Sequence, residues 1–420
     1  MATAVASVTD LCLAAKAAAR PLAATPSAVK DAALRAVADA LEARLDEILE
    51  ANARDLDAGR ESGLSAALMD RLALTPDRVR TMAAGVRAIA ALPDPVGEVV
   101  DGRRLPNGLE FRKVRVPLGV VAVVYEARPN VTIDAAALCL KSGNAVVLRG
   151  SSSAAHSNAV LASVAREAAE GAGLPAGCLA LVAGGGREEL AELAGQEGVV
   201  DLIIPRGGEG LKKALSAVAR VPVIYAASGN CHVYVDATAD LDAAERIILN
   251  AKVQRPGVCN AAETLLVHAA VAEAFLPRAL AALSGAGVEL RGDERTRALA
   301  RVSVREATEA DWAEEFLALV LAVRVVDSLE EAIAHVNRYG SGHSEAIVTR
   351  DRDAARAFQL GVDAACVYVN ASTRFTDGGE FGMGAEIGNS TQKLHARGPI
   401  GLRELCSTRY LVDGDGHVRA

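Results

Sequence analysis

Residues 120–148 read VVAVVYEARPNVTIDAAALCLKSGNAVVL, and this stretch decides the fold. The valine-rich run Val120–Tyr125 predicts a buried strand, Ile133–Lys141 predicts a helix, and Ala145–Leu148 predicts a second strand. Apolar runs that alternate with helices are typical of parallel strands covered on both faces. The sequence therefore predicts a doubly wound parallel α/β sheet.

The alternation extends in both directions from this stretch. Toward the N-terminus, segments 25–58 and 76–92 are predicted helices that begin at Thr-Pro signals. Toward the C-terminus, the first α/β pattern continues with these predicted elements: strands 178–182, 201–204, 221–225 and 233–236, and helices 153–170, 187–194 and 210–218. A second α/β pattern starts near Asp240, so we expect two α/β domains.

A hairpin is predicted over Val99–Val116, because polar and apolar residues alternate around Pro106–Asn107–Gly108. It is either an arm or a locally packed excursion. Ser407–Val412 is predicted to be a last strand, after a glycine-rich segment that forms either a binding loop or a flexible cover.

Composition excludes several classes of protein. A net charge of −8 and a pI near 5.5 argue against nucleic-acid binding. The seven cysteines never form a C-x-x-C pair and the histidines are isolated, so neither a disulfide framework nor a metal site is predicted. Segment Met1–Ala24 lacks the pattern of a signal peptide, and no segment has the apolar length to span a membrane. We therefore expect a soluble protein of the reducing cytoplasm.

Glycine- and serine-rich loops follow three predicted strands, where sheets of this kind bind ligands. None is a G-x-G-x-x-G motif, since Glu189 stands where the third glycine would be. A single such loop can be only a tight turn, but three together favour a nucleotide. Arg149 either meets the 2′-phosphate of NADP or is a solvated surface arginine. The candidate cofactor-binding residues in these loops are Arg149, Ser151, Gly184, Gly207 and Gly208.

The candidate nucleophile is Cys259, in the stretch Gln254–Thr264 that reads QRPGVCNAAET. A thiolate attacks carbonyl carbon well, and neighbouring cations such as Arg255 stabilise it. Cysteine is also among the most buried residue types, so packing is the alternative interpretation.

Four motifs together resemble the aldehyde dehydrogenase superfamily. Gly173–Gly177 followed by a strand, and a cysteine loop that opens a second α/β domain, are the general likeness. Within the superfamily, the segments Tyr125–Thr132, Gln254–Asn260 and Glu380–Gly388 resemble the gamma-glutamyl phosphate reductase family. This likeness covers nearly the whole chain.

The resemblance implies an enzyme of proline biosynthesis in which NADPH reduces L-glutamyl 5-phosphate to L-glutamate 5-semialdehyde and phosphate is released. Cys259 would form a thioester, and its backbone N–H and the Asn130 side chain would hold the oxyanion. Glu315 falls where the superfamily places a glutamate that binds the nicotinamide ribose; a capping or surface acid is the alternative.

One departure from the superfamily pattern is informative. Hydrolytic members carry a glutamate base after the nicotinamide-side loop, whereas residues 211–235 contain no Asp or Glu. Without a base that activates water, a thioester survives until hydride arrives, which favours a reductase.

The candidate substrate contacts are two arginines and a glycine-rich loop. Arg128 and Arg255 could receive the acyl phosphate, or they could pair with Glu126 and Glu263. The likeness places the glutamyl head near the loop that contains Gly382 and Gly384. The alternatives to a phosphate reductase are a CoA-acylating aldehyde dehydrogenase and a non-catalytic nucleotide-binding scaffold.

The resemblance also implies a domain plan and partners. Residues 1–98 and 117–239 would bind NADP, residues 240–395 would hold the cysteine, and residues 99–116 with 396–420 would form an oligomerisation element. A homo-oligomer, either dimer or tetramer, and a functional link to glutamate 5-kinase are expected.

Overall fold

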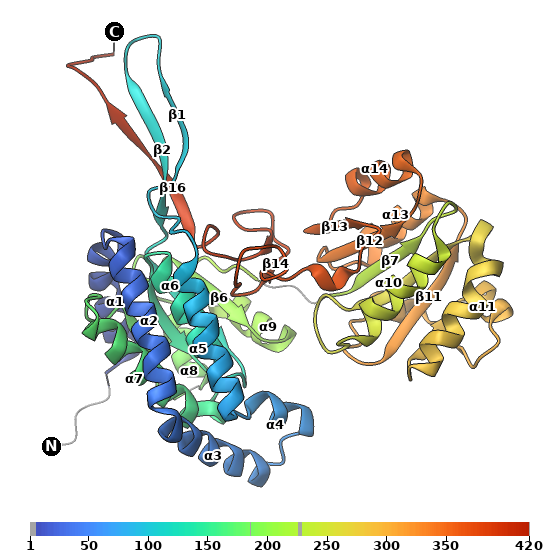
Figure 1. The fold of residues 1–420 in the computed structure, drawn as a ribbon, viewed down its shortest axis with the longest axis horizontal. Coiled ribbons are helices and arrows are strands. Elements are labelled where there is room, and N and C mark those ends of the chain that lie inside the picture. The colour runs from blue at the N-terminus through green and yellow to red at the C-terminus, as the bar shows by residue number, and fades with distance from the viewer. Residues whose placement is uncertain (1–5, 185, 226–228, 420) are drawn as a thin grey trace. The chain divides into compact units, whose positions relative to one another are not determined.

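The computed structural model describes residues 6–184, 186–225 and 229–419 (Figure 1). It contains two compact units. The first comprises Met1–Tyr225, Gly382–Gly388 and Ile400–Ala420, and the second comprises Ala226–Phe381 and Asn389–Pro399.

The first unit is built on a four-stranded parallel sheet in the order β5-β4-β3-β6. Its strands are β3 (Val120–Tyr125), β4 (Ala145–Arg149), β5 (Leu179–Leu181) and β6 (Leu202–Arg206). All residues of β3 and β4 are buried, as the valine runs predicted. The chain proceeds from β3 to β5 on one side and then returns to place β6 against the free edge of β3, so the strand order reverses between β3 and β6.

Helices cover this sheet and form the N-terminal part of the chain. They are α1 (Val8–Ala23), α2 (Ser27–Ala43), α3 (Leu45–Glu61), α4 (Ala66–Leu72), α5 (Pro76–Ala91), α6 (Asn130–Lys141), η1 (Ser152–Ala154), α7 (Ala155–Gly171), α8 (Arg187–Ala194) and α9 (Glu209–Val218). The Thr75 side chain accepts a hydrogen bond from the Arg78 N–H, which confirms the predicted start of α5.

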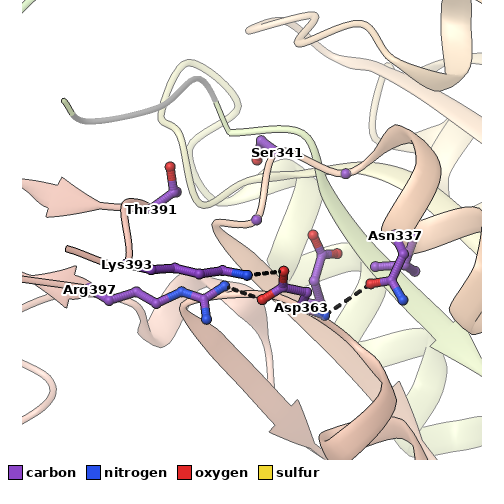
Figure 2. Close-up of a pocket in the computed structure, with 10 residues that line it drawn as sticks. Asn337, Ser341, Asp363, Thr391, Lys393 and Arg397 are labelled. Carbon is purple, nitrogen blue, oxygen red and sulfur yellow. Dashed lines mark hydrogen bonds and ion pairs between the residues drawn. The ribbon is translucent and has the colours of Figure 1, made fainter.

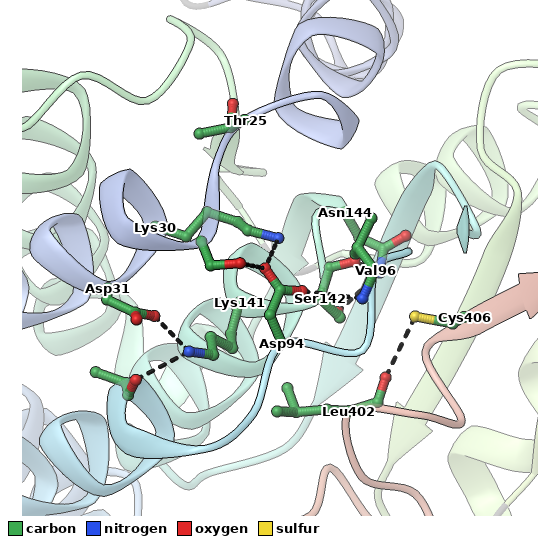
Figure 3. A network of polar contacts seen from close by, with 12 residues as sticks. Thr25, Lys30, Asp31, Asp94, Val96, Lys141, Ser142, Asn144, Leu402 and Cys406 are labelled. Carbon is green, nitrogen blue, oxygen red and sulfur yellow. Dashed lines mark hydrogen bonds and ion pairs between the residues drawn. The ribbon is translucent and has the colours of Figure 1, made fainter. Parts of the chain in front are cut away.

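Two buried lysines join α2 and α6 to their surroundings (Figure 3). The ammonium of Lys30 lies 2.5 Å from Asp94, and that of Lys141 pairs with Asp31 and donates to the Ala90 carbonyl. Near them, the Asn144 amide donates to the Leu405 carbonyl and so ties the C-terminal segment to this unit. Because a buried charge is tolerated only when it is paired, these contacts favour one arrangement of the helices.

The predicted hairpin is present as β1 (Val99–Arg104) and β2 (Glu110–Pro117). β16 (Cys406–Asp413) pairs antiparallel with β2 along its whole length, so a C-terminal strand completes a three-stranded arm. Figure 1 shows this arm extending away from the helices of the first unit.

The second unit is built on a seven-stranded parallel sheet in the order β10-β9-β11-β8-β7-β12-β13. Its strands are β7 (Cys231–Val235), β8 (Ala262–His268), β9 (Glu289–Gly292), β10 (Arg305–Glu306), β11 (Val320–Val326), β12 (Ser344–Val348) and β13 (Cys366–Val369), with a separate short pair β14 (Asn389–Ser390) and β15 (Gly398–Pro399). Its helices are α10 (Leu241–Val253), α11 (Ala269–Gly285), α12 (Glu294–Leu299), η2 (Glu309–Trp312), α13 (Leu329–Tyr339), α14 (Arg352–Gly361) and η3 (Thr373–Phe375).

Two sequence-based predictions about elements are wrong. The helix predicted over 25–58 is two helices, because Arg44 leaves helical geometry and the Thr25 hydroxyl bonds back to Pro21 in α1. Segment 221–225 makes a single bridge, between Val223 and Ile203, because Pro222 has no N–H to continue a ladder. The strand predicted at 233–236 is confirmed as β7, which pairs with β8 and β12 in the sheet of the second unit.

Candidate active site

The Cys259 loop leaves the C-terminus of α10 and enters β8 through a tight turn, which the Ala261 N–H closes onto the Val258 carbonyl. Cys259 is exposed, whereas the six other cysteines are buried free thiols. Burial raises the pKa of the Cys178 thiol to about 12 and that of Cys12 to about 11. Exposure therefore singles out Cys259 as the accessible thiol, while its role as nucleophile stays a prediction.

Gly229, just before β7, and Cys231, the first residue of β7, hold the backbone of Cys259. A Cβ on Gly229 would lie 1.5 Å from the Cys259 carbonyl oxygen, so only glycine allows these two segments to pack together. The Cys231 thiol donates to the same carbonyl at 3.2 Å. Burial first, and then Glu345, raise the pKa of Cys231 well above its ordinary value, so it is a neutral donor.

Arg374 lies against the cysteine loop and was not identified from the sequence. Its Nε donates to Gln254 at 2.8 Å and its Nη1 donates to Asn260, so it bonds to residues on both sides of Cys259. The Asn260 amide in turn donates to the Thr376 carbonyl at 2.9 Å, and the Thr373 hydroxyl donates to the Asn260 carbonyl at 2.7 Å. The segment after β13 therefore fixes the loop.

Glu315 lies in the same region, because its carboxylate accepts a hydrogen bond of 2.7 Å from the Gly229 N–H. Glu263, at the start of β8, forms a fully buried pair with Lys252. Burial raises the pKa of Glu263 to about 7, with the Glu315 charge adding to the shift. The expected partner of Arg255 is thus occupied by a lysine.

A buried polar layer lies behind the loop, at the start of β12. His343 Nδ1 lies 2.8 Å from the Ser344 hydroxyl, which lies 2.5 Å from the Thr376 hydroxyl. Burial lowers the pKa of His343 to about 4, so its imidazole is neutral at physiological pH. His232 Nδ1 lies 3.0 Å from the buried Glu345 carboxylate, and burial raises the pKa of Glu345.

A polar cavity of about 250 Å³ opens beside this layer (Figure 2). Lys393 and Arg397 both reach Asp363, whose N–H donates to the Asn337 side chain. Ser341 also lines the cavity and accepts a hydrogen bond of 3.0 Å from the Asn230 N–H. None of the site residues predicted from the sequence lines it.

Asn130 begins α6 in the first unit, just after β3. Its side-chain Nδ2 donates to Asp134 at 2.9 Å, and one of its two N–H bonds remains for another acceptor. Burial raises the pKa of Asp134, while the charge of Arg206 acts in the opposite direction. Asp134 is a positioning contact that the sequence did not reveal.

The loops after β3 and β6 meet where the strand order reverses. The Gly208 N–H donates to Glu126 at 3.3 Å, and a Cβ on Gly207 would lie 2.7 Å from the Glu126 carboxyl carbon. Glu126 thus accepts a hydrogen bond from a backbone N–H. Arg128 is exposed on the same loop.

Arg149 ends β4, and its guanidinium is buried and donates to the Gly186 carbonyl at 2.7 Å. Desolvation lowers the pKa of Arg149, against the opposite effect of Glu189. The Glu189 carboxylate fills the space above both Gly184 and Gly186, since a Cβ on either glycine would lie within 2.7 Å of it. Gly185, within the same predicted loop, lies outside the described residues.

The positions in these loops differ in how well they suit a phosphate-bearing nucleotide. Gly208 precedes the N-terminus of α9, and a Cβ added to Gly208 would meet no atom within 4 Å. Ser151 caps η1, where its hydroxyl accepts from the Ser153 N–H. The N-terminus of α8 is less suitable because Glu189 already supplies a negative charge there.

The loop that contains Gly382 and Gly384 places both glycines at positive φ, 72° and 77°. A Cβ on Gly384 would lie 2.7 Å from Leu92, and one on Gly388 would lie 2.6 Å from the Arg206 guanidinium. The glycines are therefore needed for backbone turns and close packing in the first unit.

Residues 2–311 and 302–409 match the aldehyde dehydrogenase family. The chain belongs to this family. Curated relatives in the family include a gamma-glutamyl phosphate reductase of Thermobifida fusca, 60% identical over 390 residues (93% of each chain), and one of Moorella thermoacetica, 58% identical over 405 residues (96% of this chain and 97% of the relative).

Solved structures of the family agree with the fold. A gamma-glutamyl phosphate reductase of Thermotoga maritima superposes with a TM-score of 0.97 at 44% identity, over 99% of this chain and 100% of the other. An acetylating aldehyde dehydrogenase of Geobacillus thermoglucosidasius has a TM-score of 0.70 at 20% identity, over 98% and 97% of the two chains, which shows the shared fold alone.

The described residues lack both a metal-ligand cluster and a membrane-spanning helix. Among residues 6–184, 186–225 and 229–419, no cluster of three or more metal-ligating side chains occurs. Within the same ranges, no helix has the length and apolar character needed to cross a membrane. Residues 226–228, part of the stretch without acids, lie outside the described residues.

Proposed function

We propose that this chain catalyses the NADPH-dependent reduction of L-glutamyl 5-phosphate to L-glutamate 5-semialdehyde, with release of phosphate, in proline biosynthesis. The observation that carries the proposal is the full-length identity of 55–60% to curated relatives named gamma-glutamyl phosphate reductase. The exposed Cys259, held by Gly229 and flanked by arginines, supplies chemistry that suits this reaction.

The first step is attack of the Cys259 thiolate on the acyl carbon of the substrate. The S–C bond forms, the C–O bond to phosphate breaks, and the phosphate oxygen retains the electron pair. The backbone N–H of Cys259 and the Asn130 amide would stabilise the oxyanion. Phosphate is a good leaving group, so a protonating histidine is not required, which agrees with the neutral, buried His343.

A nicotinamide, when bound, would supply a hydride to the thioester carbon. Cys259 would then leave as the thiolate while the carbonyl of the aldehyde product re-forms. For the cofactor, Arg149 would meet the 2′-phosphate, while Ser151 and the Gly207–Gly208 turn would approach the rest of the nucleotide. Glu315, fixed by the Gly229 N–H, would accept from a ribose hydroxyl. Residues 211–235 contain no Asp or Glu, so this stretch would supply no base to activate water against the thioester.

The reaction is tested in reverse, because the acyl phosphate is labile. Purified protein, glutamate semialdehyde, inorganic phosphate and NADP⁺ should form NADPH, and Cys259→Ala should abolish it. NADPH formation without phosphate would identify an aldehyde oxidiser. Activity only with CoA in place of phosphate would identify a CoA-acylating enzyme, and the absence of activity with cofactor binding retained would favour a scaffold.

We also propose that the arm associates with a second copy of the chain. Its exposed apolar residues, Val99, Val100, Tyr410 and Val412, support this assignment. Sedimentation of the wild type and of Tyr410→Asp would test it, and an unchanged mass for the variant would contradict the role of the arm. The free thiols of all seven cysteines support a reducing, cytoplasmic location, and a functional link to glutamate 5-kinase is part of the proposed pathway.

A further inference from the structure

Two arginines and the nucleophile lie together in the second unit. Arg374 and Arg255 are close enough for the charge of Arg255 to lower the pKa of Arg374, although desolvation is the larger cause. The charge of a Cys259 thiolate acts on Arg374 in the opposite direction, so both Arg255 and Cys259 lie within electrostatic range of Arg374. Asp377 and the buried Cys231 also raise the pKa of Arg374.

Two neighbouring guanidinium groups repel each other and favour binding of an anion between or beside them. No helix N-terminus of the cysteine-bearing segment supplies this attraction, because the loop leaves the C-terminal end of α10, where the helix dipole is negative. In this segment a thiolate must therefore be stabilised by side-chain cations.

Arg374 is held in a defined orientation. It is half-buried, and its Nε and Nη1 donate to Gln254 and Asn260 on the cysteine loop. A guanidinium has five N–H donors, so these two hydrogen bonds leave three, including both on Nη2. Arg255 is exposed on the loop itself and can approach the same ligand.

We propose that Arg374 and Arg255 form a two-guanidinium anion site beside Cys259, which stabilises the thiolate and then binds the phosphoryl group of the acyl phosphate. The site rests on the proposed function for the identity of its anion. When the thiolate attacks, its negative charge passes to the acyl oxygen and then to the departing phosphate oxygen. The two arginines are thus opposite an anion at every stage, and in the reverse reaction they hold inorganic phosphate for attack on the thioester.

The first test is alkylation of Cys259, which needs no turnover. Iodoacetate is an anion and iodoacetamide is neutral, and both react with the thiolate, so the ratio of their rates reports a local positive charge. We expect Arg374→Gln and Arg255→Gln each to lower this ratio about fivefold, the order expected for one unit charge at a partly exposed site. The onset of iodoacetamide reactivity should also move upward by about one pH unit.

The matched control is Arg278→Gln, which removes the same charge from an exposed ion-paired arginine on α11. It should leave both the ratio and the pH profile unchanged. Arg374→Lys keeps the positive charge but loses the planar guanidinium that can donate two hydrogen bonds to one phosphate. Compared with Arg374→Gln, it should therefore restore most of the pH profile of alkylation and little of the phosphate affinity. Arg255→Gln keeps the proposal testable if Arg374→Gln does not fold, because Arg255 is exposed.

The second test measures phosphate directly. Inorganic phosphate should slow alkylation of the wild type, and in the reverse assay the KM for phosphate should rise about tenfold or more in Arg374→Gln, with the KM for NADP⁺ unchanged. A folded Arg374→Gln protein with the wild-type alkylation ratio would overturn the proposal. A lowered ratio in a protein without phosphate-dependent turnover would instead overturn the proposed function and leave an anion site of another substrate.

Discussion

In the first unit the candidate residues follow the strands of the parallel sheet, whereas in the second unit the candidate nucleophile and the glycine packed against it precede strands. Asn130 lies after β3 and Arg149 ends β4, but Gly229 lies before β7 and Cys259 before β8. Loops after strands lead into helix N-termini, which attract phosphate. Loops before strands leave helix C-termini, so the second unit must supply positive charge from side chains such as Arg374. One kind of sheet therefore supports two kinds of site.

The strongest test of this contrast is Gly229→Ala. Its Cβ would lie 1.5 Å from the Cys259 carbonyl oxygen, so the cysteine loop must move. We expect kcat to fall by more than about 1,000-fold, since even a 1 Å misplacement can cost roughly 100-fold. The control is Gly208→Ala, whose Cβ meets no atom within 4 Å, and which should retain Cys259 alkylation. Equal kcat values for the two variants would remove the contrast.

Asn130→Ala tests the first unit's part in catalysis. Loss of one oxyanion donor should reduce kcat about 100- to 1,000-fold, with the KM for NADPH unchanged. Asn337→Ala, which removes an amide that donates to the Gly361 carbonyl, is the control in the rate assay. Wild-type turnover of Asn130→Ala would show that the oxyanion is held elsewhere.

His343 tests the buried layer that precedes β12. Its folded pKa is about 4 while an unfolded histidine titrates near 6.5, so the unfolded state takes up a proton first as the pH falls. The free energy of unfolding should therefore fall between pH 6.5 and 4. His343→Gln should remove up to roughly 3 kcal/mol of this dependence. Denaturant titrations at several pH values measure it, with exposed His417→Gln as the control. If the free energy of unfolding of His343→Gln changes with pH as steeply as that of the wild type, the neutral buried imidazole is refuted.

The smallest effect is expected for Arg149→Met. Loss of a charged hydrogen bond to the 2′-phosphate should raise the KM for NADPH about tenfold, corresponding to ~1.5 kcal/mol, and leave that for NADH nearly unchanged. The ratio of the two KM values is the measurement. An equal rise for both cofactors would mean that Arg149 supports the Gly186 loop and does not select NADPH.

Local chemistry in the sequence was sufficient for much of the fold and for the choice of Cys259 as the candidate nucleophile. The valine runs predicted β3 and β4, the alternating pattern predicted the hairpin β1–β2, and Cys259 stood out in its motif. These features depend on near neighbours in the chain, through hydrophobic periodicity and turn residues.

Only the tertiary structure decided which distant residues meet. Arg374 is 115 positions from Cys259 and belongs to no periodic pattern, so its bonds across the cysteine loop became visible only after β13 and β8 took their places in one sheet. The close packing of Gly229 and the occupation of the glycine loop by Glu189 depend on the same kind of contact. The sequence by itself determined the elements and the position of the candidate nucleophile. Strand order and packing determined the charges and hydrogen bonds around its thiol, because these act through space and not along the chain.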